Sequence, residues 1–159
     1  MSWLMSGWMR VLAILLVCGP LQAAPGVTTP FHQVFEQAAA PMLLIEPDSG
    51  RIVDANPATA AFYGHAREAL RAMTIQAINT LSDEQVAQER ALAASQQRKH
   101  FVFVHRLADG ERRTVKVASS PVRVDGRLLL LSIVTDITPG PHDEHILQHF
   151  QQRLEAQVA

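Results

Sequence analysis

Cysteine is almost missing from this sequence of 159 residues, which contains only Cys18. An intramolecular disulfide, a CxxC zinc site and a dithiol redox centre are therefore excluded. A surplus of positive charge is also missing, because 14 lysines and arginines are balanced by 15 aspartates and glutamates. Proteins that bind a phosphate backbone need such a surplus, so the composition disfavours nucleic acid as a partner. Hydrophobic residues make up 48% of the chain, enough for the core of one domain with short appendages.

The first residues have the pattern of an export signal. Arg10 precedes an apolar run over residues 11–18 that ends at Gly19 and Pro20, and Ala23 is a small residue suited to signal peptidase. These parts predict a secretory signal peptide over residues 1–23 and a periplasmic or secreted mature chain. The alternative is an uncleaved anchor in the inner membrane, and only then do we expect membrane contact. The run itself is short for a spanning helix, which needs about 20 residues.

The next segments are a linker, a helix and a hairpin. Residues 24–30 are rich in proline, glycine and threonine and are predicted to be a linker. A short amphipathic helix is expected after Pro30, because apolar side chains recur with helical spacing at Phe31, Val34, Phe35 and Ala38. Strands over residues 41–46 and 51–55 are joined by a Pro-Asp-Ser-Gly turn, which predicts a hairpin.

Three helices are expected in the middle of the chain. Asn56 can cap a helix that begins at Pro57 and stops at Gly64. A second short helix is expected over residues 66–72. Ser82 and Gln85 form a capping box for a longer helix from Asp83 to about Arg98, with a shallow, alanine-rich apolar face.

Three strands complete the predicted domain, over residues 101–107, 112–124 and 127–137, with Asp-Gly turns between them. Pro121 needs a bulge or an edge position, because proline cannot donate to a ladder. The last strand is apolar on both faces and should be central. Residues 139–159 are predicted to be a linker and an amphipathic helix for helix pairing, whose apolar seam is Leu147, Phe150, Leu154 and Val158.

This order of elements predicts an α+β fold. We expect one five-stranded antiparallel sheet with short helices on one face, and a hollow between the two layers. Two groups of residues carry a family resemblance within residues 31–138. Residues 52–58, 62–64 and 68–70 resemble the first half of a PAS (PAS/PAC, S-box) sensor domain. Residues 109–117 and the closing residues 134–138, Val-Thr-Asp-Ile-Thr, resemble its second half.

The resemblance implies a signalling role. PAS domains sense a ligand, cofactor or redox state, or dimerise, and pass a conformational change to an effector such as a histidine kinase, a diguanylate cyclase or a transcription factor. No GGDEF-like signature, phosphoacceptor box or phosphate-binding glycine loop is present, so we expect no enzyme activity. Three interpretations stay open: a stand-alone sensor acting on a partner, a truncated sensor part of a cyclase or kinase, and a ligand-free module that dimerises.

The hollow supplies the candidate binding residues. We expect a small apolar or amphipathic ligand, with the candidate lining Ile45, Asn56, Phe62, Tyr63, Met73, Ile78, Phe103, His105, Val117 and Leu130. For Asn56 the alternative is a capping role, and for Tyr63 it is packing of a helix onto the sheet. Asp136, Ile137 and Thr138 are the candidate relay, with Asp136 accepting N–H groups where the sheet meets the last helix.

The cofactor remains unidentified. Haem sensors of the PAS family generally take their iron ligand from the helices before the third strand, and residues 82–98 contain no histidine. His65 and His100 are the remaining candidates. Flavin–cysteinyl photochemistry is excluded, because the light-sensing relatives use a cysteine inside the domain and Cys18 lies in the predicted signal. No metal site is predicted, and the expected partners are a small molecule and either a second copy or a signalling effector.

Overall fold

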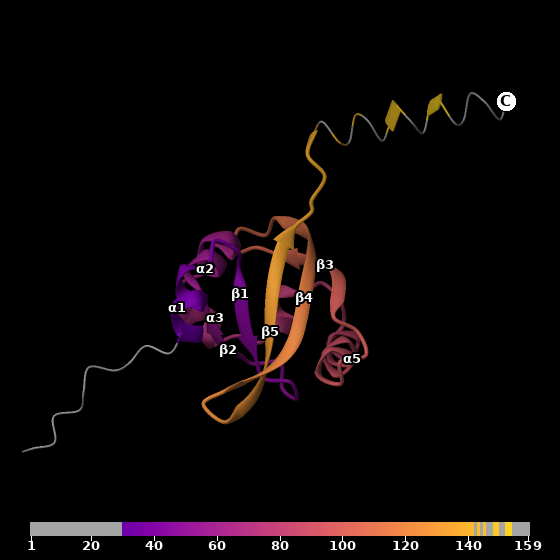
Figure 1. Ribbon diagram of the computed structural model, residues 1–159. Coiled ribbons are helices and arrows are strands. Elements are labelled where there is room, and N and C mark those ends of the chain that lie inside the picture. The colour runs from indigo at the N-terminus through magenta and orange to yellow at the C-terminus, as the bar shows by residue number, and fades with distance from the viewer. Residues whose placement is uncertain (1–29, 142, 144, 146–147, 150–151, 154–159) are drawn as a thin grey trace, which may run out of the picture.

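A computed structural model describes residues 30–141, together with 143, 145, 148–149 and 152–153 (Figure 1). The predicted signal peptide, residues 24–29 of the linker and the seam residues of the last helix lie outside the described residues. Among the helices of the described part, none combines the length and apolar character needed to cross a bilayer.

The sheet has the five antiparallel strands that the sequence predicts. They are β1 (Met42–Ile45), β2 (Ile52–Ala55), β3 (His100–Arg106), β4 (Arg112–Val124) and β5 (Arg127–Asp136). Their order across the sheet is β2-β1-β5-β4-β3, so β5 is central, as its two apolar faces indicate (Figure 1). Leu130 and Val134 of β5 belong to one core cluster, whereas Leu129 belongs to another on the opposite face.

Pro121 occupies a locally free edge, one of the two positions predicted for it. The pairing of β3 with β4 ends at His100 and Ala118, and Pro121 lies beyond it and pairs only with Leu130 of β5. The β4–β5 turn at Asp125 and Gly126 has φ of 49° and 76°, which matches the right-handed twist of the hairpin.

Four helices separate the first two strands from the last three. They are α2 (Pro57–Tyr63), α3 (Arg67–Arg71), α4 (Ile75–Ile78) and α5 (Asp83–Ala94). The capping box of Ser82 and Gln85 is present at the start of α5. The helix ends earlier than predicted, because Ser95 caps it and Gln96 adopts a left-handed φ of 58°. Helix α4 was not expected, since four residues are too few to show a helical period.

The core lies on both faces of the sheet. The large cluster contains Leu43 and Ile45 of β1 together with buried side chains of α2 to α5. Helix α1 (Pro30–Gln37) instead buries Phe35 against Leu44 and Leu129, in a smaller cluster. Because side chains alternate along β1, α1 covers the face opposite the other helices. The predicted single helical layer is therefore extended by one helix on the other face.

Candidate functional site

A cavity of about 40 Å³ lies between the sheet and α5, with room for a few water molecules or a few non-hydrogen atoms. Its lining is mainly apolar. The apolar members are Leu43, Ile45, Phe101, Phe103, Val117, Leu130 and Val134 from the sheet, and Ile75, Val86 and Ala93 from α4 and α5. Helix α5 contributes Ala93 to this lining, and a side chain as short as alanine leaves space in front of the sheet.

Polar groups reach the cavity from two sides. Ser119 of β4 and Ser132 of β5 lie on its floor, with 2.9 Å between their hydroxyl oxygens. His105 of β3 and Asn79, which follows α4, also line the cavity. Both side chains are buried, with 2% and 7% of their surface exposed. An apolar pocket with a few convergent polar groups is the usual form of a small-molecule site.

His105 connects three elements through its two ring nitrogens. Nδ1 lies 2.8 Å from the hydroxyl oxygen of Tyr63 in α2. Nε2 lies 3.4 Å from Nδ2 of Asn79, which follows α4. Phe103 stacks on the imidazole with 5.6 Å between ring centroids. Burial lowers the pKa of His105 to about 4, so the ring is neutral at physiological pH. Burial also raises the pKa of the Tyr63 hydroxyl, which stays protonated.

Arg90 fastens α5 to the β1–β2 turn. Its Nε donates to the carbonyl of Pro47 and its Nη2 to the carbonyl of Asp48, both at 3.0 Å. Burial lowers the pKa of Arg90, while Asp48 and Asp83 oppose the shift. Gly50 is required beneath this contact: its φ is +74°, and a Cβ there would lie 2.6 Å from Nη1 of Arg90.

The structure brings five of the predicted lining residues to the cavity: Ile45, Phe103, His105, Val117 and Leu130. The other five do not line it. Phe62 and Met73 pack at the margin of the main core, Ile78 is fully buried within it, and Tyr63 reaches His105 from the far side of the imidazole. These four side chains pack in or against the main core, and the space lies under α5 instead.

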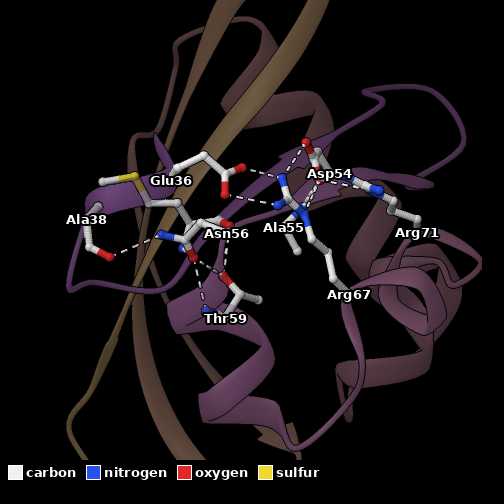
Figure 2. A network of polar contacts seen from close by, with 9 residues as sticks. Glu36, Ala38, Asp54, Ala55, Asn56, Thr59, Arg67 and Arg71 are labelled. Atoms are coloured by element: carbon white, nitrogen blue, oxygen red, sulfur yellow. Dashed lines mark hydrogen bonds and ion pairs between the residues drawn. The ribbon is translucent and has the colours of Figure 1, made fainter. Parts of the chain in front are cut away.

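Asn56 is also outside the lining, because its amide is fully occupied by the backbone (Figure 2). Oδ1 accepts the N–H groups of Met42 and Thr59, both at 3.0 Å. Nδ2 donates to the carbonyls of Ala40 at 2.9 Å and Ala38 at 3.4 Å. Both lone pairs and both amide hydrogens are used. The capping alternative therefore accounts for this residue.

Next to Asn56 an ion-pair cluster joins α1, β2 and α3 (Figure 2). Arg67 donates from Nε to Asp54 at 3.0 Å and binds the carboxylate of Glu36, while Arg71 lies 2.8 Å from Asp54. Burial disfavours the charged form of Asp54, but hydrogen bonds from Arg67, the backbone of Ala55 and Arg71 outweigh it and lower the pKa of Asp54. The cluster fixes α1 to the rest of the domain.

The predicted junction at the end of β5 is tied to β4. Oδ1 of Asp136 accepts the backbone N–H of Thr138 at 2.9 Å and its hydroxyl at 2.6 Å. The Thr138 hydroxyl accepts the N–H of Thr114 at 2.9 Å, and the N–H of Ile137 donates to the carbonyl of Thr114, also at 2.9 Å. Burial opposes ionisation of Asp136, but Thr138 and Arg113 outweigh it and lower its pKa. Asp136 thus accepts N–H groups, as predicted.

The two candidate haem ligands are placed elsewhere. His65 follows α2 in the loop to α3, and His100 is exposed at the start of β3. Neither lines the cavity. Asn79, Arg90, Ser119 and Ser132 were missed by sequence reasoning. The alternation of β4 and β5 could have located both serines, since Val117 and Leu130 share their faces, but nothing in the sequence marks Arg90 as buried.

A model of the PAS fold matches residues 35–139. The chain belongs to the PAS family. This confirms the resemblance drawn from its two groups of residues, and the matched region is a PAS sensory domain of signal transduction, which is not catalytic by itself.

The domain is similar to the PAS domain of a protein from Desulfitobacterium hafniense, with a TM-score of 0.62, 19% identity, and coverage of 66% of this chain and 99% of that one. It is also similar to a PAS domain from Haloarcula marismortui, with a TM-score of 0.60, 21% identity, and coverage of 65% of this chain and 86% of that one. At these identities the two structures show the fold alone.

Curated relatives include the diguanylate cyclase DgcM of Escherichia coli K12. It is 36% identical over 127 residues, which cover 75% of this chain and 30% of the cyclase. The same enzyme from Escherichia coli O157:H7 matches with the same identity and coverage. The chain thus spans less than a third of the length of these relatives.

Proposed function

We propose that this PAS domain binds a small, largely apolar molecule in the cavity under α5 and relays its presence through β5. The observation that carries the proposal is the cavity itself, because it combines an apolar lining with buried polar side chains from β3, β4 and β5. Its volume of about 40 Å³ suits a ligand of a few non-hydrogen atoms. A larger ligand requires α5 to move away from the sheet.

The proposed relay runs along one strand. Leu130, Ser132 and Val134 of β5 line the cavity, and the same strand ends at the Asp136–Thr138 junction. A ligand that binds two conformations of β5 with different affinities shifts their populations. The hydrogen bonds between this junction and Thr114 would carry the shift to the segment that follows, and from there to an effector.

Thermal melting of the purified chain with a panel of small metabolites tests the binding step. A ligand present at 100 times its Kd stabilises the domain by about 2.7 kcal/mol, which is a clear rise in Tm. Ala93→Leu fills the cavity from α5 and should abolish the rise. Ala87→Leu makes the same change on the exposed side of α5 and serves as the matched control. A panel that leaves the Tm unchanged, or a rise that survives Ala93→Leu, contradicts the proposal.

A second candidate function is the sensor part of a diguanylate cyclase, and the similarity to DgcM supports it. The effector would then be a cyclase catalytic region. Fusion of this chain to a cyclase region of known activity tests this candidate. Ligand-dependent synthesis of cyclic di-GMP supports it, and constant synthesis across the ligands that bind contradicts it.

Export to the periplasm remains a separate proposal, based on the pattern of residues 1–23. Fractionation of cells that express the full chain tests it. A shortened protein in the periplasmic extract supports a cleaved signal, and full-length protein in the inner membrane supports the anchor.

A further inference from the structure

The buried polar chain Tyr63–His105–Asn79 carries more hydrogens than its own acceptors can pair. His105 is neutral, so its ring carries a single N–H and a single acceptor nitrogen. Tyr63 brings one hydroxyl hydrogen, and Asn79 turns its NH₂ group towards Nε2 of the imidazole. The orientation of the Asn79 amide is fixed, because its Oδ1 accepts the N–H of Leu81 at 3.0 Å. The position of the ring proton decides which group is left without an acceptor.

Only two arrangements are available. If Nδ1 carries the proton, it donates to Tyr63, and the Tyr63 hydroxyl hydrogen has no acceptor among the described residues, although its side chain is fully buried. If Nε2 carries the proton, Tyr63 donates to Nδ1 at 2.8 Å, which is a normal hydrogen bond. Nε2–H and the Asn79 NH₂ are then two donors 3.4 Å apart, on two side chains that line the cavity.

An acceptor that enters the cavity can pair both donors of the second arrangement. A buried O–H with no acceptor is costly, and no described group can relieve it from the Tyr63 side. Two unpaired donors next to the cavity can instead share one oxygen atom of a guest. We propose that the cavity recognises a small neutral carbonyl compound, whose oxygen accepts hydrogen bonds from Nε2–H of His105 and from Nδ2 of Asn79. This inference rests on the proposed ligand-binding function and names the ligand class.

A neutral oxygen is favoured over a carboxylate by the charges present. Arg90 is the cation of the lining, and two of its three nitrogens donate to the carbonyls of Pro47 and Asp48. Glu89 brings a negative charge to the same lining, and it is paired with Arg98 at 2.8 Å. The third nitrogen, Nη1, is buried without a partner and lies beneath Gly50. Next to His105 an anion would be desolvated among Tyr63, Asn79 and the imidazole, which are all uncharged, and this is expensive.

Tyr63 acts in this scheme as a positioning residue, because it touches His105 and does not line the cavity. Its hydroxyl keeps the ring proton on Nε2. In Tyr63→Phe, Nδ1 loses its donor, so the proton can move to Nδ1 and Nε2 can accept from Asn79. The cavity would then lose one donor with no change in its lining. Thr59→Val is the matched control, since it removes another fully buried hydroxyl that does not contact His105.

Nitrogen-15 NMR of the full chain, labelled at histidine, reads the tautomer directly. With 2-butanone bound, we expect His105 as the Nε2–H tautomer in the wild type and in Thr59→Val, and a shift towards Nδ1–H in Tyr63→Phe. A wild-type ring that stays protonated on Nδ1 with 2-butanone bound overturns the inference.

Three probes of similar size test the ligand class: 2-butanone, butanoate and 2-methylbutane, in which a methyl group replaces the carbonyl oxygen. We expect 2-butanone to shift the His105 Nε2–H signal and to bind about tenfold more weakly to Tyr63→Phe, as expected for one lost hydrogen bond. Thr59→Val should keep the wild-type affinity within about twofold, well inside that tenfold change. Equal binding of 2-methylbutane, or preference for butanoate, overturns the assignment. If none of the three binds, the carbonyl class is wrong, whereas a Tm rise with another metabolite would keep the proposed function.

Discussion

Asn56 and His105 are equally inaccessible to solvent, yet their hydrogen bonds differ in completeness. All four hydrogen-bonding positions of the Asn56 amide pair with nearby groups of the same chain. His105 shares its two nitrogens with Tyr63 and Asn79, and the three side chains carry more hydrogens than they can pair among themselves. The first site can only hold the fold together, whereas the second has capacity left for a guest. A count of donors and acceptors separates them where burial does not.

The largest effect is expected from Asn56→Ala. It removes the cap of α2 and leaves the N–H of Met42 and the carbonyl of Ala40 without partners. We expect a loss of about 3 kcal/mol in the free energy of unfolding, measured by urea denaturation. Asn79→Ala is the comparison variant, and we expect it to cost about 1 kcal/mol, since Asn79 makes only one short hydrogen bond, to Leu81. Equal losses at the two sites would remove the distinction between them.

The second effect is a pH dependence that belongs to His105. Its pKa falls from 6.5 to about 4 on folding, because burial disfavours the charged form. The unfolded chain therefore binds the proton more readily, so stability is full above pH 6.5 and declines as the pH falls towards 4. The decline should approach about 3 kcal/mol. The groups around the ring are Tyr63, Asn79 and the cross-strand Arg113. The charged groups of the cavity lining are Glu89 and Arg90 of α5.

Urea denaturation of the wild type and His105→Gln from pH 7 to pH 4 checks this decline. The part of the slope assigned to His105 should disappear in the variant. The Asp54 cluster near Asn56 should not contribute in this range, because the pKa of Asp54 is lowered and its stabilisation is lost only as the pH falls through that lower value. An unchanged slope in His105→Gln would contradict the lowered pKa of His105.

A smaller effect is expected from Thr138→Val at the end of β5. The hydroxyl bridges Asp136 and the N–H of Thr114, and its loss should cost about 1 kcal/mol. Amide hydrogen exchange should accelerate at Thr114, while the amides next to Asn56 keep their protection. Uniform acceleration over the domain would mean that the junction is not a local contact.

Arg71→Ala should have the smallest effect, below about 1 kcal/mol, because the side chain is 42% exposed and Asp54 keeps its contacts with Arg67. Raising the salt concentration should reduce the difference further, since salt screens exposed pairs. Urea denaturation at low and high salt checks this. A loss as large as that of Asn56→Ala would show that this exposed ion pair contributes as much stability as the buried amide.

The sequence predicts the framework better than the cavity. Asn56, Pro57 and Gly64 define α2 locally, and the apolar faces of β5 identify its central place, because these signals lie in neighbouring residues. His105 was among the predicted lining residues, and it reaches the cavity with Phe101 and Phe103 from the same strand. The space under α5 depends on how far alanine side chains stand from a sheet that is distant in sequence, and on Arg90 binding carbonyls 42 and 43 residues away. No local pattern encodes such distances, so the sequence did not show that the space lies under α5 and away from Phe62 and Met73.

The attachment of α5 also bears on kinetics. Arg90 holds the helix through two carbonyls of the β1–β2 turn, and Gly50 leaves the space for its guanidinium. A guest too large for the unchanged cavity has to lift the helix and break both contacts before it can pass. The residence time of such a guest would then depend on the Arg90 contacts with the β1–β2 turn. A substitution at position 50 or 90 would change the dissociation rate of the guest, and hence the lifetime of the signal, while leaving its equilibrium affinity nearly the same.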